Sequence, residues 1–159
     1  MAPRATRSEA RDELPDADLR SASLMDADDV AALLTELGYP CERGEALERI
    51  SSIIDNDRQV LVLARISGVV SGLMALDFMY YLPLGTHTCR VTALVVTPEA
   101  QGRGLGRQLL REAERRARAG GAARIELASG SQRADAHAFY KACGYSDGTL
   151  RFIKRLGDA

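Results

Sequence analysis

The sequence has few cysteines and almost no excess of charge. Its three cysteines, Cys41, Cys89 and Cys143, are odd in number and show no CxxC spacing. This pattern argues against a disulfide framework or a zinc site and fits a reducing compartment, so we expect a cytoplasmic protein without a metal. The 21 basic and 22 acidic residues leave a formal charge of -1. Such a balance gives no reason to expect nucleic acid or an anionic membrane as a partner.

Internal repeats and low-complexity segments are also absent. Residues 1–17, MAPRATRSEARDELPDA, contain no long apolar stretch, which argues against a secretory signal or a membrane span there. Four acidic residues in the same stretch argue against an organelle transit peptide. We expect a disordered tail over residues 1–17 and a single domain over residues 18–159, which is large enough to bury a hydrophobic core.

Hydrophobic periodicity predicts a mixed α/β domain. The expected strands cover residues 19–23, 59–66, 69–78, 89–96, 123–129 and 148–156. The expected helices lie between Asp26 as N-cap and Gly38, over residues 44–54, from Gly104 to the pair 120–121, and over residues 134–143. Ser67 and Gly68 join two strands as a tight hairpin.

The helix that begins near Gly104 is amphipathic. Its expected apolar face consists of Leu105, Leu109, Leu110, Ala113 and Ala117, with arginines on the other faces. On the second helix, Leu47, Ile50 and Ile54 follow the same spacing. Because the run CRVTALVV is rich in β-branched residues, we expect it to be a central strand.

Three glycines alternate in QGRGLGR, between that strand and the amphipathic helix. Gly102, Gly104 and Gly106 clear side chains from the loop, while Arg103 and Arg107 add positive charge. The N–H groups and dipole of a helix N-terminus favour anions. A flexible connector does not explain a glycine inside the helical segment, where it costs about 1 kcal/mol relative to alanine. The loop therefore predicts a pyrophosphate site.

Two other kinds of phosphate loop fit less well. No lysine follows these glycines, so the P-loop of nucleoside triphosphatases does not match. A dinucleotide-binding loop has the pattern GxGxxG directly after its strand, whereas TPEAQ separates these glycines from theirs. Glu126 follows the glycines at the sequence distance expected for a ribose-binding acid, but it falls within the apolar run IELAS. Dinucleotide binding therefore remains a minor alternative.

The segment LVVTPEAQGRGLGRQLL resembles the acyl-CoA pyrophosphate loop of the GNAT (GCN5-related) N-acetyltransferases. Gln101, Gly104 and Gly106 occupy the fixed positions of that family's pattern. AHAFYKACGY resembles the family's C-terminal helix, and LRSASLMDADDVAALLTELG resembles its first strand and helix. The resemblance covers roughly residues 19–156.

The resemblance implies a central mixed, mostly antiparallel sheet flanked by about four helices and splayed between CRVTALVV and ARIELAS. Acetyl-CoA would enter that opening, with the backbone of Leu94, Val95 and Val96 along its pantetheine arm. The pyrophosphate would be held by the loop residues Gln101, Gly102, Arg103, Gly104, Leu105, Gly106 and Arg107.

Tyr140 is the catalytic residue that the resemblance implies. The family commonly uses a tyrosine at this position to protonate the departing thiolate, a role that suits a phenol near developing negative charge. Without the family context, a packed helical tyrosine with one hydrogen bond is the simpler interpretation. Phe139 and Cys143 share a helix face, so we expect Cys143 to face the core rather than act as a nucleophile.

The amine acceptor needs a base or a water path, and the sequence does not identify one. Many family members carry a glutamate on the strand before the loop, where this sequence has Ala93. Asp77, His87 and Glu126 are the candidate bases, and His87 has the most suitable intrinsic pKa. A solvated or loop position is the alternative for each, and an ordered water or a neutral acceptor would make a base unnecessary.

Simple alternation divides the strand VTALVV into two faces. Val91, Ala93 and Val95 are expected on one face, and Thr92, Leu94 and Val96 on the other.

The segment DFMYYLPLGTHTCR lies where the family commonly forms its acceptor wall. An aromatic pocket is expected from Phe78, Tyr80, Tyr81 and His87, with Asp77 attracting an amine. Packing within a hairpin is the alternative interpretation. This layout, DAHAFY and the ending LRFIKRL also faintly resemble the aminoalkylphosphonate acetyltransferases.

These features predict an acetyl-CoA-dependent N-acetyltransferase that acetylates a primary amine, with a small molecule favoured, by direct attack in a ternary complex. The alternatives are a CoA-binding sensor or regulatory domain that has lost catalysis, and a dinucleotide-binding module. The acceptor remains open among a small polyamine-like or phosphonate amine, an antibiotic and a protein N-terminus. Dimers are common in the family, so the choice between monomer and homodimer also stays open.

Overall fold

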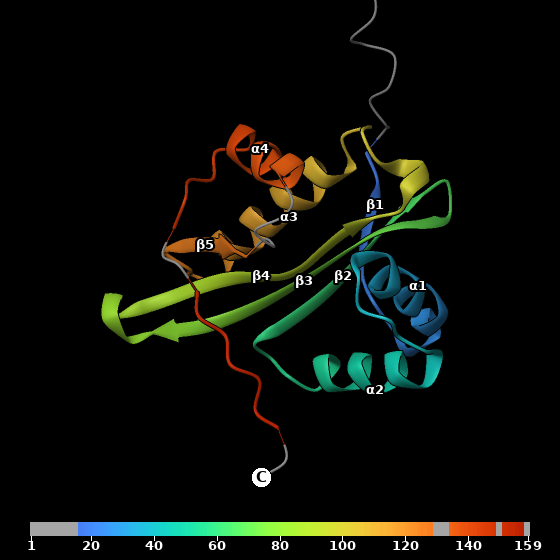
Figure 1. Ribbon diagram of the computed structural model, residues 1–159, viewed down its shortest axis with the longest axis horizontal. Coiled ribbons are helices and arrows are strands. Elements are labelled where there is room, and N and C mark those ends of the chain that lie inside the picture. Colours follow the sequence, from blue (N-terminus) through green and yellow to red (C-terminus); the bar gives the residue numbers. More distant parts are fainter. Residues whose placement is uncertain (1–15, 129–133, 149–150, 158–159) are drawn as a thin grey trace, which may run out of the picture. The chain divides into compact units, whose positions relative to one another are not determined.

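One five-stranded sheet organises the chain. The computed structural model describes residues 16–128, 134–148 and 151–157. The strands lie in the order β1-β2-β3-β4-β5 (Figure 1). They are β1 (Asp18–Ser21), β2 (Gln59–Ile66), β3 (Val69–Tyr81), β4 (Thr86–Val96) and β5 (Arg124–Leu127). The first four strands are antiparallel neighbours and β5 runs parallel to β4, so the predicted mixed, mostly antiparallel sheet is confirmed.

The described residues form four α-helices. They are α1 (Ala27–Leu37), α2 (Arg43–Ile54), α3 (Leu105–Ala119) and α4 (Ala134–Ala142). Short 3-10 turns precede α1 and α3 and form the tip between β3 and β4: η1 (Leu24–Asp26), η3 (Pro98–Ala100) and η2 (Leu82–Leu84). Residues 1–128 and 129–159 form two compact units, and α4 belongs to the second. None of the described helices is long and apolar enough to cross a membrane.

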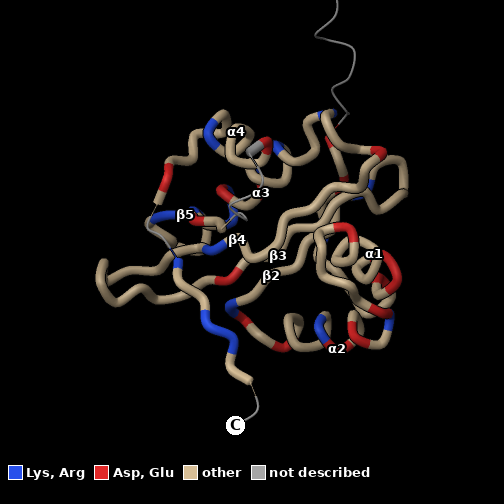
Figure 2. The backbone as a smooth tube through the Cα atoms, in the orientation of Figure 1, with Lys and Arg blue, Asp and Glu red and all other residues tan. Residues whose placement is uncertain are grey.

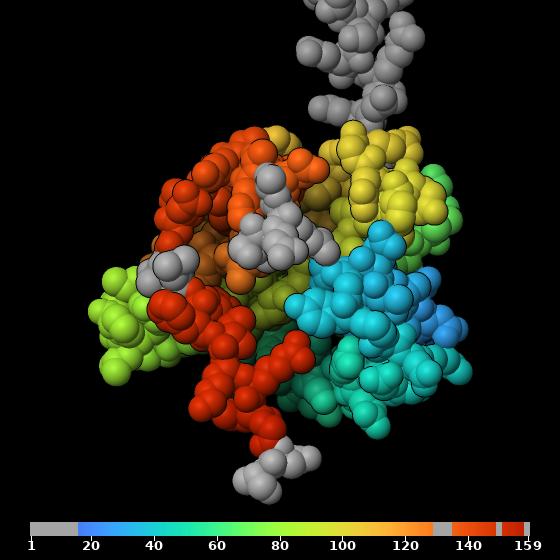
Figure 3. Space-filling view, viewed as in Figure 1, coloured from blue at the N-terminus to red at the C-terminus, as the bar shows by residue number. Residues whose placement is uncertain are grey.

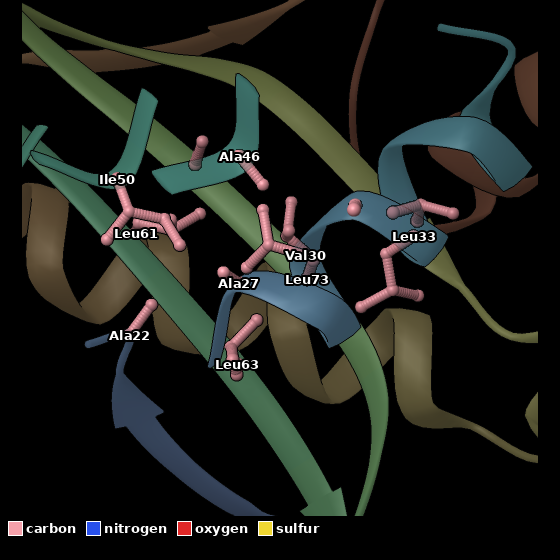
Figure 4. Packing of buried hydrophobic residues seen from close by; sticks show 12 residues of the cluster. Ala22, Ala27, Val30, Leu33, Ala46, Ile50, Leu61, Leu63 and Leu73 are labelled. Carbon is pink, nitrogen blue, oxygen red and sulfur yellow. The ribbon is translucent and has the colours of Figure 1, made fainter. Parts of the chain in front are cut away.

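Helices cover both faces of the sheet in the first unit. Figure 4 shows α1 and α2 in front of the strands, with Val30, Ala46 and Ile50 pointing at Leu61 and Leu73. On the opposite face, α3 buries the five predicted residues Leu105, Leu109, Leu110, Ala113 and Ala117. The helix periodicity that placed these residues on one face is therefore confirmed.

The helix and strand ends differ in detail from the prediction. Asp26 occupies the predicted N-cap position of α1 but makes no cap hydrogen bond; its carboxylate accepts the N–H of Ser23 at 2.8 Å and pairs with Arg65 at 2.6 Å. Ile54 is 53% exposed, because α2 ends there, while Ile50 is buried. The expected final strand, 148–156, is wrong where the structure describes it: residues 151–157 form no strand, and no described strand supplies them with ladder hydrogen bonds.

A β-bulge in β4 overturns the predicted division of its faces. Ala75 of β3 pairs with Ala93 and the next residue, Leu76, pairs with Val91, so Thr92 is the extra residue. The alternation shifts by one at this point. Val91 consequently packs in the cluster on the α3 side together with Leu94 and Val96, whereas Ala93 and Val95 face α1 and α2.

Gly120 ends α3 against an aromatic ring of β3. A Cβ at this position would lie 2.7 Å from Cε1 of Phe78, which packs against the buried cluster on the α3 side. Gly120→Ala should therefore force the helix end and the ring apart and lower the free energy of unfolding by about 1–3 kcal/mol. Urea denaturation measures this change.

The matched control is Gly44→Ala in α2, where a Cβ would meet no atom within 4 Å. This change should leave the free energy of unfolding unaltered or raise it by about 0.4–1 kcal/mol. Equal effects of the two substitutions would contradict the packing described at Gly120.

Candidate functional site

The described pairing of β4 with β5 covers only part of β4. Their parallel ladder runs from the pair Thr88 and Arg124 to the pair Val91 and Leu127. Beyond Val91, no described residue pairs with β4 on that side, and the bulge at Thr92 marks the point of separation. On that side, the described residues give residues 92–96 no strand partner, and the carbonyl of Val96 accepts from the Gln101 side chain instead. The described pairing thus ends between CRVTALVV and ARIELAS, the two strands between which the resemblance implied a splay.

The loop that follows β4 bends sharply back into α3. Gly102 has φ 72° and Gly104 has φ 88°, a left-handed conformation that L side chains rarely adopt. Gln101 donates from Nε2 to the carbonyl of Val96 at 3.1 Å, which ties the loop to the end of β4. Figure 3 shows this segment, in yellow, at the surface of the molecule. The left-handed backbone therefore explains why glycine is present at two of the three predicted positions, Gly102 and Gly104.

The loop ends at the positive end of α3. Gln108 donates the first backbone hydrogen bond of the helix, to Gly104, so the preceding amides at residues 105–107 lie before the regular ladder. Arg103 and Arg107 are both exposed, and neither forms an ion pair with a carboxylate of the described residues. Exposed guanidinium groups beside a helix N-terminus make a positively charged surface that is suited to binding a pyrophosphate.

The start of α3 approaches the sheet closely because β3 carries a glycine there. A Cβ on Gly72 would lie 3.1 Å from a methyl group of Leu109 and 3.3 Å from one of Leu105. Both leucines are buried. This packing fixes the helix N-terminus beside the end of β4. In the sequence, the only sign of this close approach was a glycine inside an apolar strand.

The predicted aromatic pocket is divided between two faces of the sheet. Phe78 packs with the α3-side cluster, and Tyr80 meets His87 edge to face with ring centroids 5.6 Å apart. Asp77 and Tyr81 are an odd number of residues from Tyr80 and so lie on the opposite face. Segment 77–90 is a continuous hairpin rather than a loop between strands, and it does not bring the four aromatic residues together.

A row of charged side chains crosses β4 and β5 on the face that carries Asp77. Arg90 donates to Glu126 through Nε at 2.7 Å and forms a 2.6 Å ion pair through a terminal nitrogen. Arg124 contacts the same carboxylate at 3.2 Å, and its Nε donates to Thr88 Oγ1 at 3.3 Å. The guanidinium of Arg124 also lies 4.4 Å from the ring centroid of Tyr81.

Of these charged residues, Asp77 and Glu126 were singled out from the sequence, and the two arginines were not. The two arginines lie at ordinary strand positions, and only the register, Asp77 opposite Arg90 and Arg90 beside Glu126, brings them together. Figure 2 shows basic and acidic positions alternating across β3, β4 and β5 in this region. Alternation of polar residues in the strand sequences was the signal that could have found them.

The three candidate bases do not lie equally close to the opening. His87 precedes Thr92 by five positions, so roughly 17 Å of strand separates them, and it faces the α3 side. Asp77 lies opposite Arg90 and is half-buried, without an ion pair to the described residues. Glu126 lies beside Arg90 and is engaged by two guanidinium groups. Of the three candidates, Asp77 and Glu126 therefore lie nearer to Thr92 than His87 does.

Cys89 is not suited to nucleophilic chemistry. Its side chain is fully buried in the α3-side cluster. Burial, helped by the negative charge of Asp77, raises the pKa of the Cys89 thiol to about 11. The thiolate, which is the reactive form, is therefore scarce near neutral pH.

Tyr140 belongs to the second unit and is surrounded by aromatic rings. Its centroid is 5.5 Å from that of Phe139 and 6.4 Å from that of Tyr145. The backbone N–H of Tyr145 donates to the carbonyl of Tyr140, which closes the end of α4. Cys143 is half-buried on the turn above Phe139.

Comparison with known proteins agrees with this architecture. The acetyltransferase (GNAT) family model matches residues 27–145. An aminoalkylphosphonate N-acetyltransferase of Salmonella typhimurium is 33% identical over 150 residues, which cover 91% of this chain and 95% of that protein. A GNAT family acetyltransferase of Staphylococcus aureus has a TM-score of 0.77 at 24% identity, covering 89% of this chain and 100% of the other.

An aminoglycoside N-acetyltransferase in complex with CoA has the same TM-score of 0.77, at 17% identity and covering 88% of this chain and 94% of that one. At these identities the two structures show a shared fold. The family match and the Salmonella relative extend over most of the sequence. The chain therefore belongs to the GNAT acetyltransferase family and is an N-acetyltransferase.

Proposed function

We propose that this enzyme transfers the acetyl group of acetyl-CoA to the primary amine of a small molecule. The observation that carries the proposal is the continuity of the β4 opening, the left-handed glycine loop and the N-terminus of α3. These three features lie in sequence along one path. A thioester with a long arm and a pyrophosphate matches that path from end to end.

In this proposal, the backbone of Leu94, Val95 and Val96 lines the pantetheine arm. The pyrophosphate lies on residues 101–107, whose glycines permit close approach and whose arginines pair with its oxygens. The aminoglycoside N-acetyltransferase of similar fold, whose structure contains CoA, supports the choice of cofactor. Neither cysteine of the first unit is suited to act as a nucleophile in an alternative mechanism. Cys89 is buried and protonated, and Cys41 lies between α1 and α2.

The reaction proceeds by direct attack in a ternary complex. The amine nitrogen forms a bond to the thioester carbonyl carbon, the C–S bond breaks, and CoA leaves as a thiolate. The amine loses a proton to water or to a carboxylate, for which Asp77 and Glu126 are the candidates. Tyr140 supplies the proton that neutralises the thiolate, so protons and charge balance over the cycle.

A small acceptor is favoured by the relative that the comparisons identify. The Salmonella protein is named for aminoalkylphosphonates, which are small amines, and it aligns with nearly the whole of this chain.

Loss of positive charge from the loop should weaken acetyl-CoA binding. Changing Arg103 and Arg107 together to alanine removes two groups that pair with the pyrophosphate. Because each charge-assisted hydrogen bond contributes about 1.5–3 kcal/mol, the dissociation constant should rise about tenfold or more. Titration calorimetry with acetyl-CoA measures this constant.

The matched control changes Arg111 and Arg118 to alanine. These arginines are exposed on the same helix but lie beyond its first turn. This variant should bind acetyl-CoA like the unmodified protein. An equal loss in both double variants would indicate a general charge effect, and no binding by the unmodified protein would refute the proposal.

Removal of the Tyr140 hydroxyl tests the thiolate-protonation step. Tyr140→Phe should lower kcat about 100-fold, since a general acid typically contributes between 100-fold and 10,000-fold. The dissociation constant for acetyl-CoA should stay unchanged, because the hydroxyl acts on the leaving group. Thiol release under saturating substrates and calorimetry give the two values.

Tyr39→Phe is the control, because Tyr39 is 66% exposed between α1 and α2. It should leave both constants unaltered. A Tyr140→Phe variant with undiminished kcat would remove Tyr140 from the catalytic step.

A further inference from the structure

The charged row on β3, β4 and β5 has opposite charges at its two ends. Across the strands the order is Asp77, Arg90, Glu126 and then Arg124, which lies two residues before Glu126 on β5. Glu126 pairs with both arginines, with Arg90 at 2.6 and 2.7 Å and with Arg124 at 3.2 Å. The row therefore ends in a carboxylate on β3 and, on β5, in a guanidinium that makes the longer of these contacts.

Arg124 keeps hydrogen-bonding capacity for a ligand. Its Nε is used by Thr88 and one terminal nitrogen by Glu126, while its other terminal nitrogen bonds to none of the described residues. The stacking on Tyr81 and the bond to the buried Thr88 hold the guanidinium in one orientation. Its side chain is still 41% exposed. A fixed, partly exposed guanidinium is a good partner for a carboxylate, phosphonate or phosphate.

Asp77 has complementary properties. It is half-buried and forms no ion pair with the described residues, although its negative charge is felt by Cys89. A half-buried carboxylate without a cation attracts an ammonium group from solvent. Its strand neighbour, Arg90, directs its guanidinium to Glu126 instead.

The row also lies beside the opening in the sheet. Arg90 precedes the bulge at Thr92 by two residues, or roughly 7 Å of strand. The strands β3 and β5 lie on either side of β4, so their backbones are roughly 10 Å apart. Asp and Arg side chains that extend from these strands leave room for an amine and an acidic group joined by two or three carbons.

We propose that Asp77 binds the ammonium group and Arg124 the acidic group of a small zwitterionic acceptor, so that Arg124 determines specificity for amines that carry an acid. This inference rests on the proposed acetyl transfer, whose acceptor class it specifies. The Arg90–Glu126 pair lies between Asp77 and Arg124 and would contact the middle of the acceptor. The acceptor amine is thereby held on the side of the sheet that carries α1 and α2, next to the place where β4 and β5 separate.

The test compares three amines: 2-aminoethylphosphonate, β-alanine and n-propylamine, which lacks an acidic group. Arg124→Gln should lower kcat/KM for the two acidic amines about 10-fold to 100-fold and leave that for n-propylamine within about threefold. Asp77→Asn should lower kcat/KM for all three amines. Arg20→Gln is the matched control, since Arg20 also lies on a strand and pairs with a carboxylate, Asp18, at 2.9 Å. It should change none of these values.

A binding measurement separates this inference from the proposed function. Calorimetric titration of 2-aminoethylphosphonate into the CoA-saturated protein needs no turnover. Binding that is lost in Arg124→Gln and kept in Arg20→Gln supports the subsite, even if no amine is acetylated. Turnover of n-propylamine as efficient as that of the acidic amines, or a loss in Arg124→Gln that is equal for all three, would overturn the inference while leaving acetyl transfer intact.

Arg124→Lys keeps the positive charge but removes the planar guanidinium group. It serves as a second variant in case Arg124→Gln does not fold. It should retain part of the preference for acidic amines. Thermal unfolding of each variant shows whether the network only stabilises the sheet. A fall in Tm without any change in the ratio of kcat/KM between acidic and plain amines would assign the row a structural role and overturn the proposal.

Discussion

The separation of β4 from β5 is the feature on which the rest of the site depends. Up to Val91 the two strands satisfy each other's backbone groups, and after it β4 continues without a described partner on that side. The bulge at Thr92 coincides with this change and shifts the side-chain alternation of β4 by one residue. Backbone groups that the sheet does not satisfy need water or a ligand, so the fold itself creates a binding surface.

The two faces of the sheet contribute different parts of the site. On one face, Gly72 admits the start of α3, which sets the helix N-terminus and its exposed arginines at the end of β4. On the other face, the strand positions beyond the α1 and α2 cluster change from apolar to charged, from Ala75 to Asp77 on β3. In the proposed reaction, acetyl-CoA would bind at the end of β4 and the acceptor would bind on the opposite face. Direct transfer in a ternary complex requires two such separate approaches.

Much of this fold could be predicted from the sequence because its local signals agree with its tertiary structure. The turn at Ser67 and Gly68, the end of α1 at Gly38 and the apolar face of α3 each follow from short-range chemistry. The loop was predicted to be a phosphate site from its glycines and arginines, because such a site needs those residue types. The failures concern long-range pairing. A bulge cannot be read from alternation alone, so Val91 was assigned to the wrong face. The contact between Arg90 and Glu126 depends on a register between residues 36 positions apart in the sequence.

Backbone hydrogen exchange with and without acetyl-CoA tests the central claim most directly, since it reports on the opening itself. The account predicts slower exchange for amides of residues 92–96 and 101–108 when acetyl-CoA is present, with little change in α1 and α2. Unchanged exchange in both segments at saturating acetyl-CoA, or protection confined to other elements, would contradict the assignment of the β4 opening and the glycine loop as the cofactor site.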